Sequence, residues 1–205
     1  MLRFYYVPGS CALATHIALV EAGAQYEPIR MSFKTGDQLQ PEYLKINPKA
    51  RVPALVTDHG VLTETPALLA YIAQTFPNAD LMPGDPFSFA KAQEFNSYLC
   101  STAHVAHAHR MRGYRWADEP EAHEAMRRKA PAAVTQCFRL IESEMLKGPW
   151  VMGEKYSLCD AYLFTLAQWL EADGVDISLI PKVHEHRERT RERPGTTRAL
   201  NEELS

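Results

Sequence analysis

The feature that most constrains the fold is a change of pattern near residue 80. Before it, short apolar segments alternate between strand and helix spacing, in the order strand, helix, strand, then strand, strand, helix. Residues 77–87 read PNADLMPGDPF, with three prolines and a glycine, which is typical of a linker. Beyond the linker the apolar repeats have helical spacing. The sequence therefore predicts an α/β unit followed by an all-helical unit.

The first unit divides into recognisable elements. Residues 2–7 read LRFYYV, an aromatic-rich strand in which we expect Tyr5 and Tyr6 to serve mainly in packing. Residues 11–23 have helical spacing and end at Gly23, a typical C-cap. The pattern then predicts a strand, a short helix, a hairpin and a longer helix, over residues 26–33, 40–49, 52–64 and 65–76.

Composition excludes several classes of function. The 205 residues carry a formal net charge of -3 with scattered basic side chains, which argues against a nucleic-acid partner. No apolar run approaches the ~20 residues that a membrane-spanning helix needs, and the first residues lack the plan of a signal peptide. The cysteines are far apart, so we expect reduced thiols and a cytoplasmic protein: Cys11, Cys100, Cys137 and Cys159.

Cys11 stands where the first strand gives way to the first helix. Unpaired backbone N–H groups and the helix dipole stabilise an anion there, so we expect a lowered thiol pKa. A thiolate bound at the same place would gain the same stabilisation. The alternative interpretation is a small buried apolar residue. The motif Cys11-Ala12-Leu13-Ala14 has no second thiol, so a redox cycle would need a resolving thiol from a substrate.

A second group of functional side chains lies in the stretch STAHVAHAHR. Helical phase places Ser97, Ser101 and His104 on one face. His107 stands one turn further, and two histidines at this spacing can chelate a metal ion. His109, however, lies about 140° around the helix from His104. No helical Asp or Glu completes a site, so we expect no metal.

Several segments together resemble those of a cytosolic glutathione S-transferase, most like the bacterial beta class. They read YYVPGSCALATHIAL, INPKARVPALV, LTETPALLAYIA, SLCDAYLFTLAQW and RERPGTTRAL, in this order and at matching spacings. The resemblance implies the glutathione S-transferase fold: a thioredoxin-like domain over residues 1–78 with a mixed four-stranded sheet (βαβ-ββα), a linker over 79–86, and an all-α domain over 87–205 with an electrophile pocket. It also implies a homodimer, and glutathione as co-substrate with no permanently bound cofactor.

The resemblance assigns roles around Cys11. It implies that Cys11 contacts glutathione and can form a mixed disulfide with it. Many beta-class sequences carry serine after this cysteine, where Ala12 stands here, and Ser10 is the hydroxyl that could replace it. The resemblance also implies a cis peptide at Val52-Pro53, which would turn the Val52 backbone toward the cysteinyl residue of glutathione. A proline that simply opens a strand is the alternative.

Other residues are candidates for the two ends of the tripeptide. Glu64 and Thr65 lie where the hairpin meets a helix N-terminus, a suitable place for the γ-glutamyl group. Thr65 is equally suited to be the N-cap. Lys34, and more weakly Arg51, are candidates for the glycyl carboxylate, with solvated surface as the alternative.

The resemblance also gives roles to the helical unit. His104 matches the histidine that beta-class proteins direct at the electrophile, and Ser101 shares its face as a glutathione contact. We expect His107, Tyr114 and Trp116 to line the electrophile pocket. A different part of this unit, SLCD, places Asp160 three residues after Ser157, which predicts a capping box with a role in folding.

We therefore expect a glutathione transferase that binds glutathione, stabilises its thiolate and transfers it to a small hydrophobic electrophile. Thiol–disulfide exchange through Cys11, a thiol transferase or reductase activity, is a competing chemistry at the same site. The alternative function is a non-catalytic ligand carrier or interaction protein, because fold does not determine function. The physiological role, whether detoxification, oxidative-stress defence or a catabolic step, depends on an electrophile that the sequence does not specify.

Overall fold

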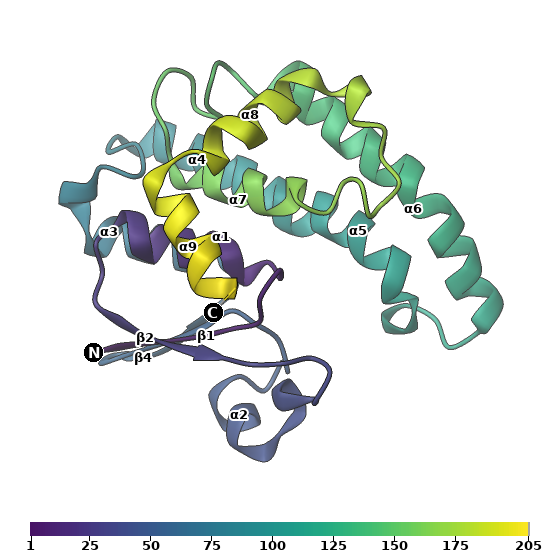
Figure 1. Ribbon diagram of the computed structural model, residues 1–205, viewed down its shortest axis with the longest axis horizontal. Helices are drawn as coiled ribbons and strands as arrows, with labels where there is room; N and C mark the ends of the chain where they lie inside the picture. The colour runs from purple at the N-terminus through teal and green to yellow at the C-terminus, as the bar shows by residue number, and fades with distance from the viewer. Residues whose placement is uncertain (205) are drawn as a thin grey trace.

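The structure is a computed structural model and describes residues 1–204. Its first part runs β1 (Leu2–Tyr6), α1 (Ala12–Glu21), β2 (Tyr26–Arg30), η1 (Asp37–Leu39), α2 (Pro41–Ile46), β3 (Ala54–Thr57), β4 (Gly60–Thr63) and α3 (Thr65–Thr75). The strands form one sheet in the order β2-β1-β3-β4 (Figure 1). β1 and β2 are parallel and the other pairs are antiparallel. The predicted mixed sheet with βαβ-ββα connectivity is confirmed.

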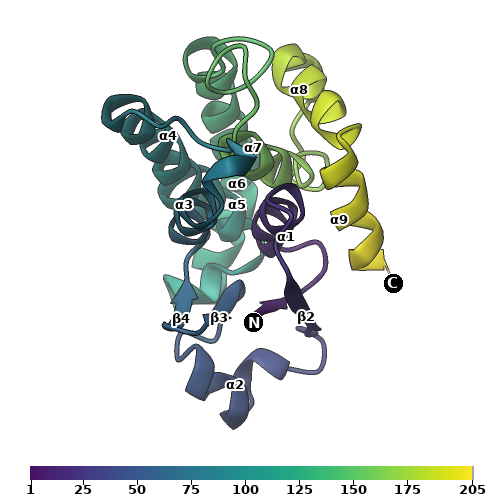
Figure 2. The same ribbon diagram turned by 90° about the vertical axis from the view of Figure 1, so that its left-hand side faces the viewer.

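The aromatic side chains of β1 pack against both faces of the sheet. Phe4 and Tyr6 are buried on one face, with ring centroids 5.4 Å apart. Tyr5 points to the opposite face, as strand alternation requires. Its ring packs against that of Tyr43 in α2, with centroids 5.6 Å apart. Helices α1 and α3 cover the first face and α2 the second (Figure 2). The packing role expected for Tyr5 and Tyr6 is thus confirmed.

The second part is helical, as predicted. A short turn η2 (Pro77–Ala79) precedes α4 (Pro86–Tyr98), and α4 continues through the π-helical segment η3 (Leu99–Ala103) into α5 (His104–Met111). After η4 (Gly113–Arg115) come α6 (Pro120–Leu140), the π-helical segment η5 (Ile141–Met145), α7 (Leu158–Ala167), η6 (Ile177–Leu179), α8 (Pro181–Arg191) and α9 (Pro194–Leu204). Among the described helices, none is long and apolar enough to span a membrane.

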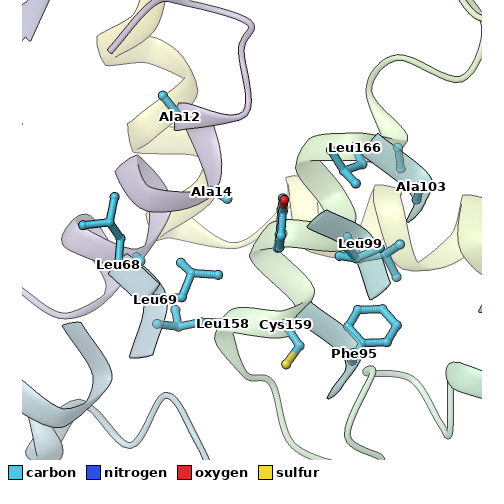
Figure 3. Packing of buried hydrophobic residues seen from close by; sticks show 14 of the residues in the cluster. Ala12, Ala14, Leu68, Leu69, Phe95, Leu99, Ala103, Leu158, Cys159 and Leu166 are labelled. Atoms are coloured by element: carbon cyan, nitrogen blue, oxygen red, sulfur yellow. The ribbon is translucent and has the colours of Figure 1, made fainter. Parts of the chain in front are cut away.

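The two parts share one apolar core. Helix α7 is buried along its whole length, which explains why its sequence is apolar on all sides. Figure 3 shows Leu158 and Leu166 of α7 beside Leu99 of η3 and Leu69 of α3. The side chain of Ala14 on α1 faces the same core, and its small size allows close approach. The helix that follows Cys11 is therefore held by both parts of the chain.

The predicted capping box at the start of α7 is confirmed. The Asp160 carboxylate accepts a hydrogen bond from the Ser157 N–H at 2.7 Å. Its other oxygen accepts from the Val151 N–H at 2.7 Å and lies 2.8 Å from His186 Nε2. Asp160 is completely buried, so these partners compensate for its lost hydration.

Helix α9 returns to the first part of the chain and packs on α1 (Figures 1 and 2). Arg193 forms an ion pair with Glu21 of α1 at 2.9 Å. The buried His16 ring lies 2.9 Å from Glu202, and Glu203 accepts a hydrogen bond from the Gly9 N–H at 2.8 Å. The end of the chain therefore anchors the loop between β1 and α1.

Candidate active site

Three separate segments meet at the Cys11 sulfur. Cys11 is the N-cap residue of α1, and its thiol donates a hydrogen bond to the Val52 carbonyl at 3.5 Å. Thr65, the first residue of α3, lies close enough to Cys11 for its hydroxyl to act on the thiol. The peptide between Val52 and Pro53 is cis, as expected. The β1–α1 junction, the start of β3 and the start of α3 thus enclose one half-buried thiol.

The protonation state of Cys11 differs from expectation. Burial raises the pKa of its thiol to about 11, while the charge of Arg112 and the Thr65 hydrogen bond act in the opposite direction. The predicted lowering of the Cys11 pKa is therefore wrong for the protein without a ligand. Loss of hydration outweighs the favourable field of the helix N-terminus, and Cys11 is a neutral thiol near pH 7.

The Ser10 hydroxyl forms its hydrogen bonds with backbone groups. Its hydroxyl donates to the Val7 carbonyl at 2.6 Å and accepts from the Ala12 N–H at 3.2 Å. The hydroxyl proton is thus directed away from Cys11, contrary to the prediction that Ser10 supplies a hydrogen bond to a thiolate. Ser10 instead stabilises the turn that leads into α1.

The turn before α3 holds a strained glutamate. Glu64 has φ of 72° and is the N-cap residue, so the expectation that Thr65 occupies the N-cap is wrong. A non-glycine residue with positive φ is uncommon and costs energy, and such residues gather at functional sites. The Lys49 ammonium pairs with the Glu64 carboxylate and donates to the Thr63 hydroxyl at 2.6 Å. Lys49 was not predicted, because a lysine in a loop has no distinguishing pattern.

Lys34 and Arg51 are exposed at the edge of this region. Neither side chain forms an ion pair within residues 1–204. The Arg51 carbonyl accepts hydrogen bonds from the Tyr43 hydroxyl and from the Asn47 side chain, both at 2.6 Å. These two bonds fix the backbone immediately before Val52.

His104 begins α5, directly after the π-helical segment η3. Its ring is tilted on the indole of Trp169, with centroids 5.2 Å apart. Burial, followed by the electrostatic effects of His107 and three arginines, lowers the pKa of His104 to about 3. His104 is therefore neutral at physiological pH and can either donate or accept a hydrogen bond.

The His107 side chain is fixed by contacts with Asp173 and Trp169. Its Nδ1 lies 2.7 Å from the buried Asp173 carboxylate, and its ring stacks on Trp169 at 4.3 Å. Trp169 in turn donates from Nε1 to the Gly9 carbonyl at 3.0 Å. This chain of contacts connects Asp173 to the loop before Cys11, and no periodic pattern in the sequence indicates it.

Ser101 and Cys100 lie in η3. Ser101 is exposed, and its hydroxyl donates to the Ser97 carbonyl at 2.8 Å. Cys100, predicted to be a core or interface residue, is half-buried, lies near the Tyr162 hydroxyl and interacts electrostatically with Cys11. Its position four residues before His104 could have indicated this location, since such residues share a helix face.

Tyr114 and Trp116 follow α5 on the surface, with 63% and 45% of their area exposed. The ring of Trp116 meets that of His109 edge-on, with centroids 4.3 Å apart. No cluster of three or more His, Cys, Asp or Glu suited to a metal ion occurs in the part of the chain that the structure describes.

A cleft of about 470 Å³ borders the other residues of the Cys11 loop. Gly9 and Ser10 form one wall, Trp169 another, and Leu200 and Leu204 of α9 close it. Cys11 and His104 do not line this cleft, whereas Trp169, whose indole contacts the His104 ring, does.

Comparison with known proteins identifies the family. Residues 1–74 match the family model described as glutathione S-transferase, N-terminal domain, and residues 99–194 match that described as glutathione S-transferase, C-terminal domain. The chain belongs to the glutathione S-transferase family.

Similar proteins span nearly the whole chain. A crystal structure of a glutathione transferase homolog from Sulfitobacter with bound glutathione is 42% identical, with a TM-score of 0.96, covering 100% of this chain and 99% of that one. Glutathione S-transferase GstA of Escherichia coli O157:H7 is 28% identical over 98% of both chains. The bacterial beta-class glutathione S-transferase of Sphingomonas chungbukensis is 32% identical, with a TM-score of 0.84 and 98% coverage of both chains.

Proposed function

We propose that this protein is a beta-class glutathione transferase that binds glutathione beside Cys11 and delivers its thiolate to a small electrophile. The observation that carries the proposal is the hydrogen bond from the Cys11 thiol to the Val52 carbonyl, with Thr65 close to the same sulfur. Three distant segments converge on one sulfur at a helix N-terminus, in a chain that belongs to a family of transferases. A catalytic function therefore fits better than a ligand carrier.

Glutathione fits the charges around this point. The Val52 backbone would pair with its cysteinyl residue in the manner of an added strand. Glu64 would meet the γ-glutamyl ammonium, while the N-terminus of α3 at Thr65 offers N–H donors to the neighbouring carboxylate. The Lys34 ammonium and the Arg51 guanidinium form no ion pair within residues 1–204 and are suited to the glycyl carboxylate.

The Ser101 hydroxyl, on the exposed side of η3, is a further candidate contact for the tripeptide.

The proposed chemistry uses Cys11 as a hydrogen-bond donor. Because its thiol is neutral near pH 7, it can donate to the sulfur of bound glutathione once that sulfur has lost its proton. Lowering a thiol pKa from ~9 to ~7 requires about 2.7 kcal/mol of thiolate stabilisation. A helix N-terminus together with one or two charge-assisted hydrogen bonds supplies that amount.

In the conjugation step, the glutathione sulfur attacks an electrophilic carbon and forms a C–S bond. The leaving group departs with the bonding electron pair, and the thiol proton passes to solvent beforehand. Neutral His104, placed against Trp169, can donate a hydrogen bond to charge that develops on the electrophile.

Thiol–disulfide exchange is a second candidate activity. It would require Cys11 itself to attack a disulfide as a thiolate; burial raises its thiol pKa to about 11 and disfavours that form, and the charge of Arg112 offsets this effect only in part. Glutathione would then resolve the mixed disulfide and leave with the second sulfur.

Replacing Cys11 separates the two activities. We expect C11A to retain conjugation of glutathione with an aryl halide at a reduced rate and to lose any glutathione-dependent disulfide reduction. A wild-type protein that is retained on immobilised glutathione but inactive with both substrate types would contradict the enzymatic proposal and favour a carrier.

We also propose that the protein works as a homodimer in the cytoplasm. The four cysteines are free, which suits a reducing compartment. Light scattering coupled to size exclusion tests the dimer: a mass near 46 kDa, about twice that of the 23.2 kDa chain, is expected, and a mass near 23.2 kDa would contradict it.

A further inference from the structure

His107 of α5 and Asp173, in the segment after α7, form a histidine–carboxylate pair. The Nδ1 atom of His107 lies 2.7 Å from a carboxylate oxygen of Asp173, whose side chain is only 2% exposed. The other carboxylate oxygen lies 3.6 Å from the Arg110 guanidinium. Because a carboxylate accepts hydrogen bonds, Nδ1 of His107 carries a proton, and Nε2 is the ring nitrogen that can gain and lose one.

A single turn of chain supplies both contacts of the His107 ring. The Asp173 N–H donates to the Trp169 carbonyl at 2.8 Å, so these two residues lie one helical turn apart. The Trp169 indole stacks on the His107 ring, with centroids 4.3 Å apart. The carboxylate therefore fixes one edge of the imidazole and the indole fixes one face. The His107 side chain is still 21% exposed, so the ring is held without being sealed from solvent.

The contacts of Trp169 place this pair next to the groups proposed for the reaction. The His104 ring packs on the same indole, with centroids 5.2 Å apart, and lies 6.1 Å from the His107 ring. The indole Nε1 donates to the Gly9 carbonyl at 3.0 Å, two residues before Cys11. An electrophile that contacts His104 would therefore lie beside the His107 ring.

The two histidines differ in what they can supply to an electrophile. Burial lowers the pKa of His104 to about 3, so His104 is neutral and has no additional proton to give. His107 has the Asp173 carboxylate behind it, which places a negative charge where an imidazolium needs one. A histidine oriented by a buried carboxylate is suited to general acid–base catalysis, because the carboxylate fixes the tautomer and stabilises the charged ring.

We propose that His107 is a catalytic general acid for electrophiles whose oxygen takes up a proton during the reaction, such as epoxides, and that Asp173 is its positioning residue. This inference rests on the proposed transferase function. The glutathione thiolate forms a C–S bond with a carbon of the epoxide, and the C–O bond at that carbon breaks. Its electron pair moves to the oxygen, which receives a proton from Nε2 of His107. The imidazole then regains a proton from solvent.

Two electrophiles with different proton requirements test the proposal. 1-Chloro-2,4-dinitrobenzene releases chloride, and its product takes up no proton, whereas 1,2-epoxy-3-(4-nitrophenoxy)propane gives an alcohol that takes up one. In H107Q the amide can still donate to Asp173 but cannot protonate an alkoxide. We expect H107Q to lower kcat for the epoxide about 100-fold, as is typical for loss of a general acid, and kcat for the aryl chloride much less.

Further variants separate proton donation from packing. H107F keeps a ring against Trp169 and should show the same selective loss as H107Q. His109 supplies the matched control, because it lies on the same helix but meets the Trp116 ring instead, and H109F should keep the wild-type ratio of the two kcat values. D173N should lower kcat for the epoxide while leaving the KM values for epoxide and glutathione near those of the wild-type protein.

A solvent deuterium isotope effect gives a readout that packing alone does not change. In the wild-type protein the effect on kcat should be larger for the epoxide than for the aryl chloride, and the difference should disappear in H107Q.

Three results would overturn the inference. If H107Q and H107F lower kcat equally for both electrophiles, His107 only shapes the site. If the wild-type protein conjugates the aryl chloride but not the epoxide, His107 is not a general acid for this class, and the transferase proposal still stands. If glutathione does not bind and neither electrophile reacts, the transferase proposal fails together with this inference.

Discussion

The indole Nε1 of Trp169 donates a hydrogen bond to the Gly9 carbonyl at 3.0 Å, from a residue just beyond α7 to the loop before Cys11. The N–H of the same glycine donates to Glu203 at 2.8 Å. Both polar groups of the Gly9 backbone are thus held by the helical part of the chain. The position of the Cys11 thiol therefore depends on residues that lie far away in the sequence.

Trp169→Phe should loosen this loop. Phenylalanine keeps an aromatic ring against His107 but cannot donate to Gly9, and the loss of one hydrogen bond should cost about 1 kcal/mol of folding free energy. We expect kcat for conjugation to fall more than the KM for glutathione rises. Urea unfolding and steady-state kinetics measure the two effects. Unchanged kcat in a stably folded variant would show that the Trp169–Gly9 bond does not position the catalytic loop.

Glu203→Ala should destabilise the protein more than its place near the chain end suggests. Glu203 is only 6% exposed, and its removal leaves the Gly9 N–H without its partner, a cost of about 1–3 kcal/mol. Leu204→Ala is the control, since Leu204 is 83% exposed. Thermal unfolding should distinguish the two variants, and equal melting temperatures would refute the anchoring role of α9.

Asp160→Ala should impair folding without altering the chemistry. The substitution deprives Val151 N–H, Ser157 N–H and His186 of a buried partner, so we expect a loss of about 3 kcal/mol or more. The specific activity of the fraction that folds should match the wild-type value, as measured after gel filtration. A folded, stable variant with low activity would place Asp160 in the catalytic machinery instead.

The Cys11 thiol should make the free energy of unfolding depend on pH in the alkaline range. Its thiol pKa is raised from 9.0 to about 11 in the folded protein, so the folded state binds this proton more tightly than the unfolded state. The contribution of this thiol to the free energy of unfolding is fully present below pH 9 and is lost as pH rises through about 11. Urea unfolding between these values should show a steeper decline for the wild-type protein than for C11A, and parallel curves would contradict the raised pKa.

Features that depend on contiguous residues were predictable from the sequence. The capping box of Ser157 and Asp160 is a spacing of three residues, and the mixed sheet follows from the order of short apolar patterns. The cis peptide at Val52-Pro53 was expected from the family resemblance.

Features that join distant residues were not predictable. Glu203 and Gly9 are separated by 194 positions and Trp169 and Gly9 by 160, so no local period connects them. The pKa of Cys11 was predicted in the wrong direction because helix position is visible in a sequence, whereas burial is a property of the folded chain. The N-cap at Glu64 was missed for a related reason. The surrounding turn imposes a positive φ on Glu64, a conformation that a glutamate rarely adopts and that its residue type therefore does not predict.

The most direct test of the account is the thiol pKa of glutathione bound to C11S, measured by thiolate absorbance across pH, with the unliganded variant subtracted. The serine hydroxyl keeps a hydrogen-bond donor at the N-terminus of α1 and removes the competing thiol at that position. A bound thiol pKa lowered by about two units from its value in water is predicted, equivalent to about 2.7 kcal/mol. A pKa equal to that of free glutathione would contradict the claim that this junction stabilises a thiolate.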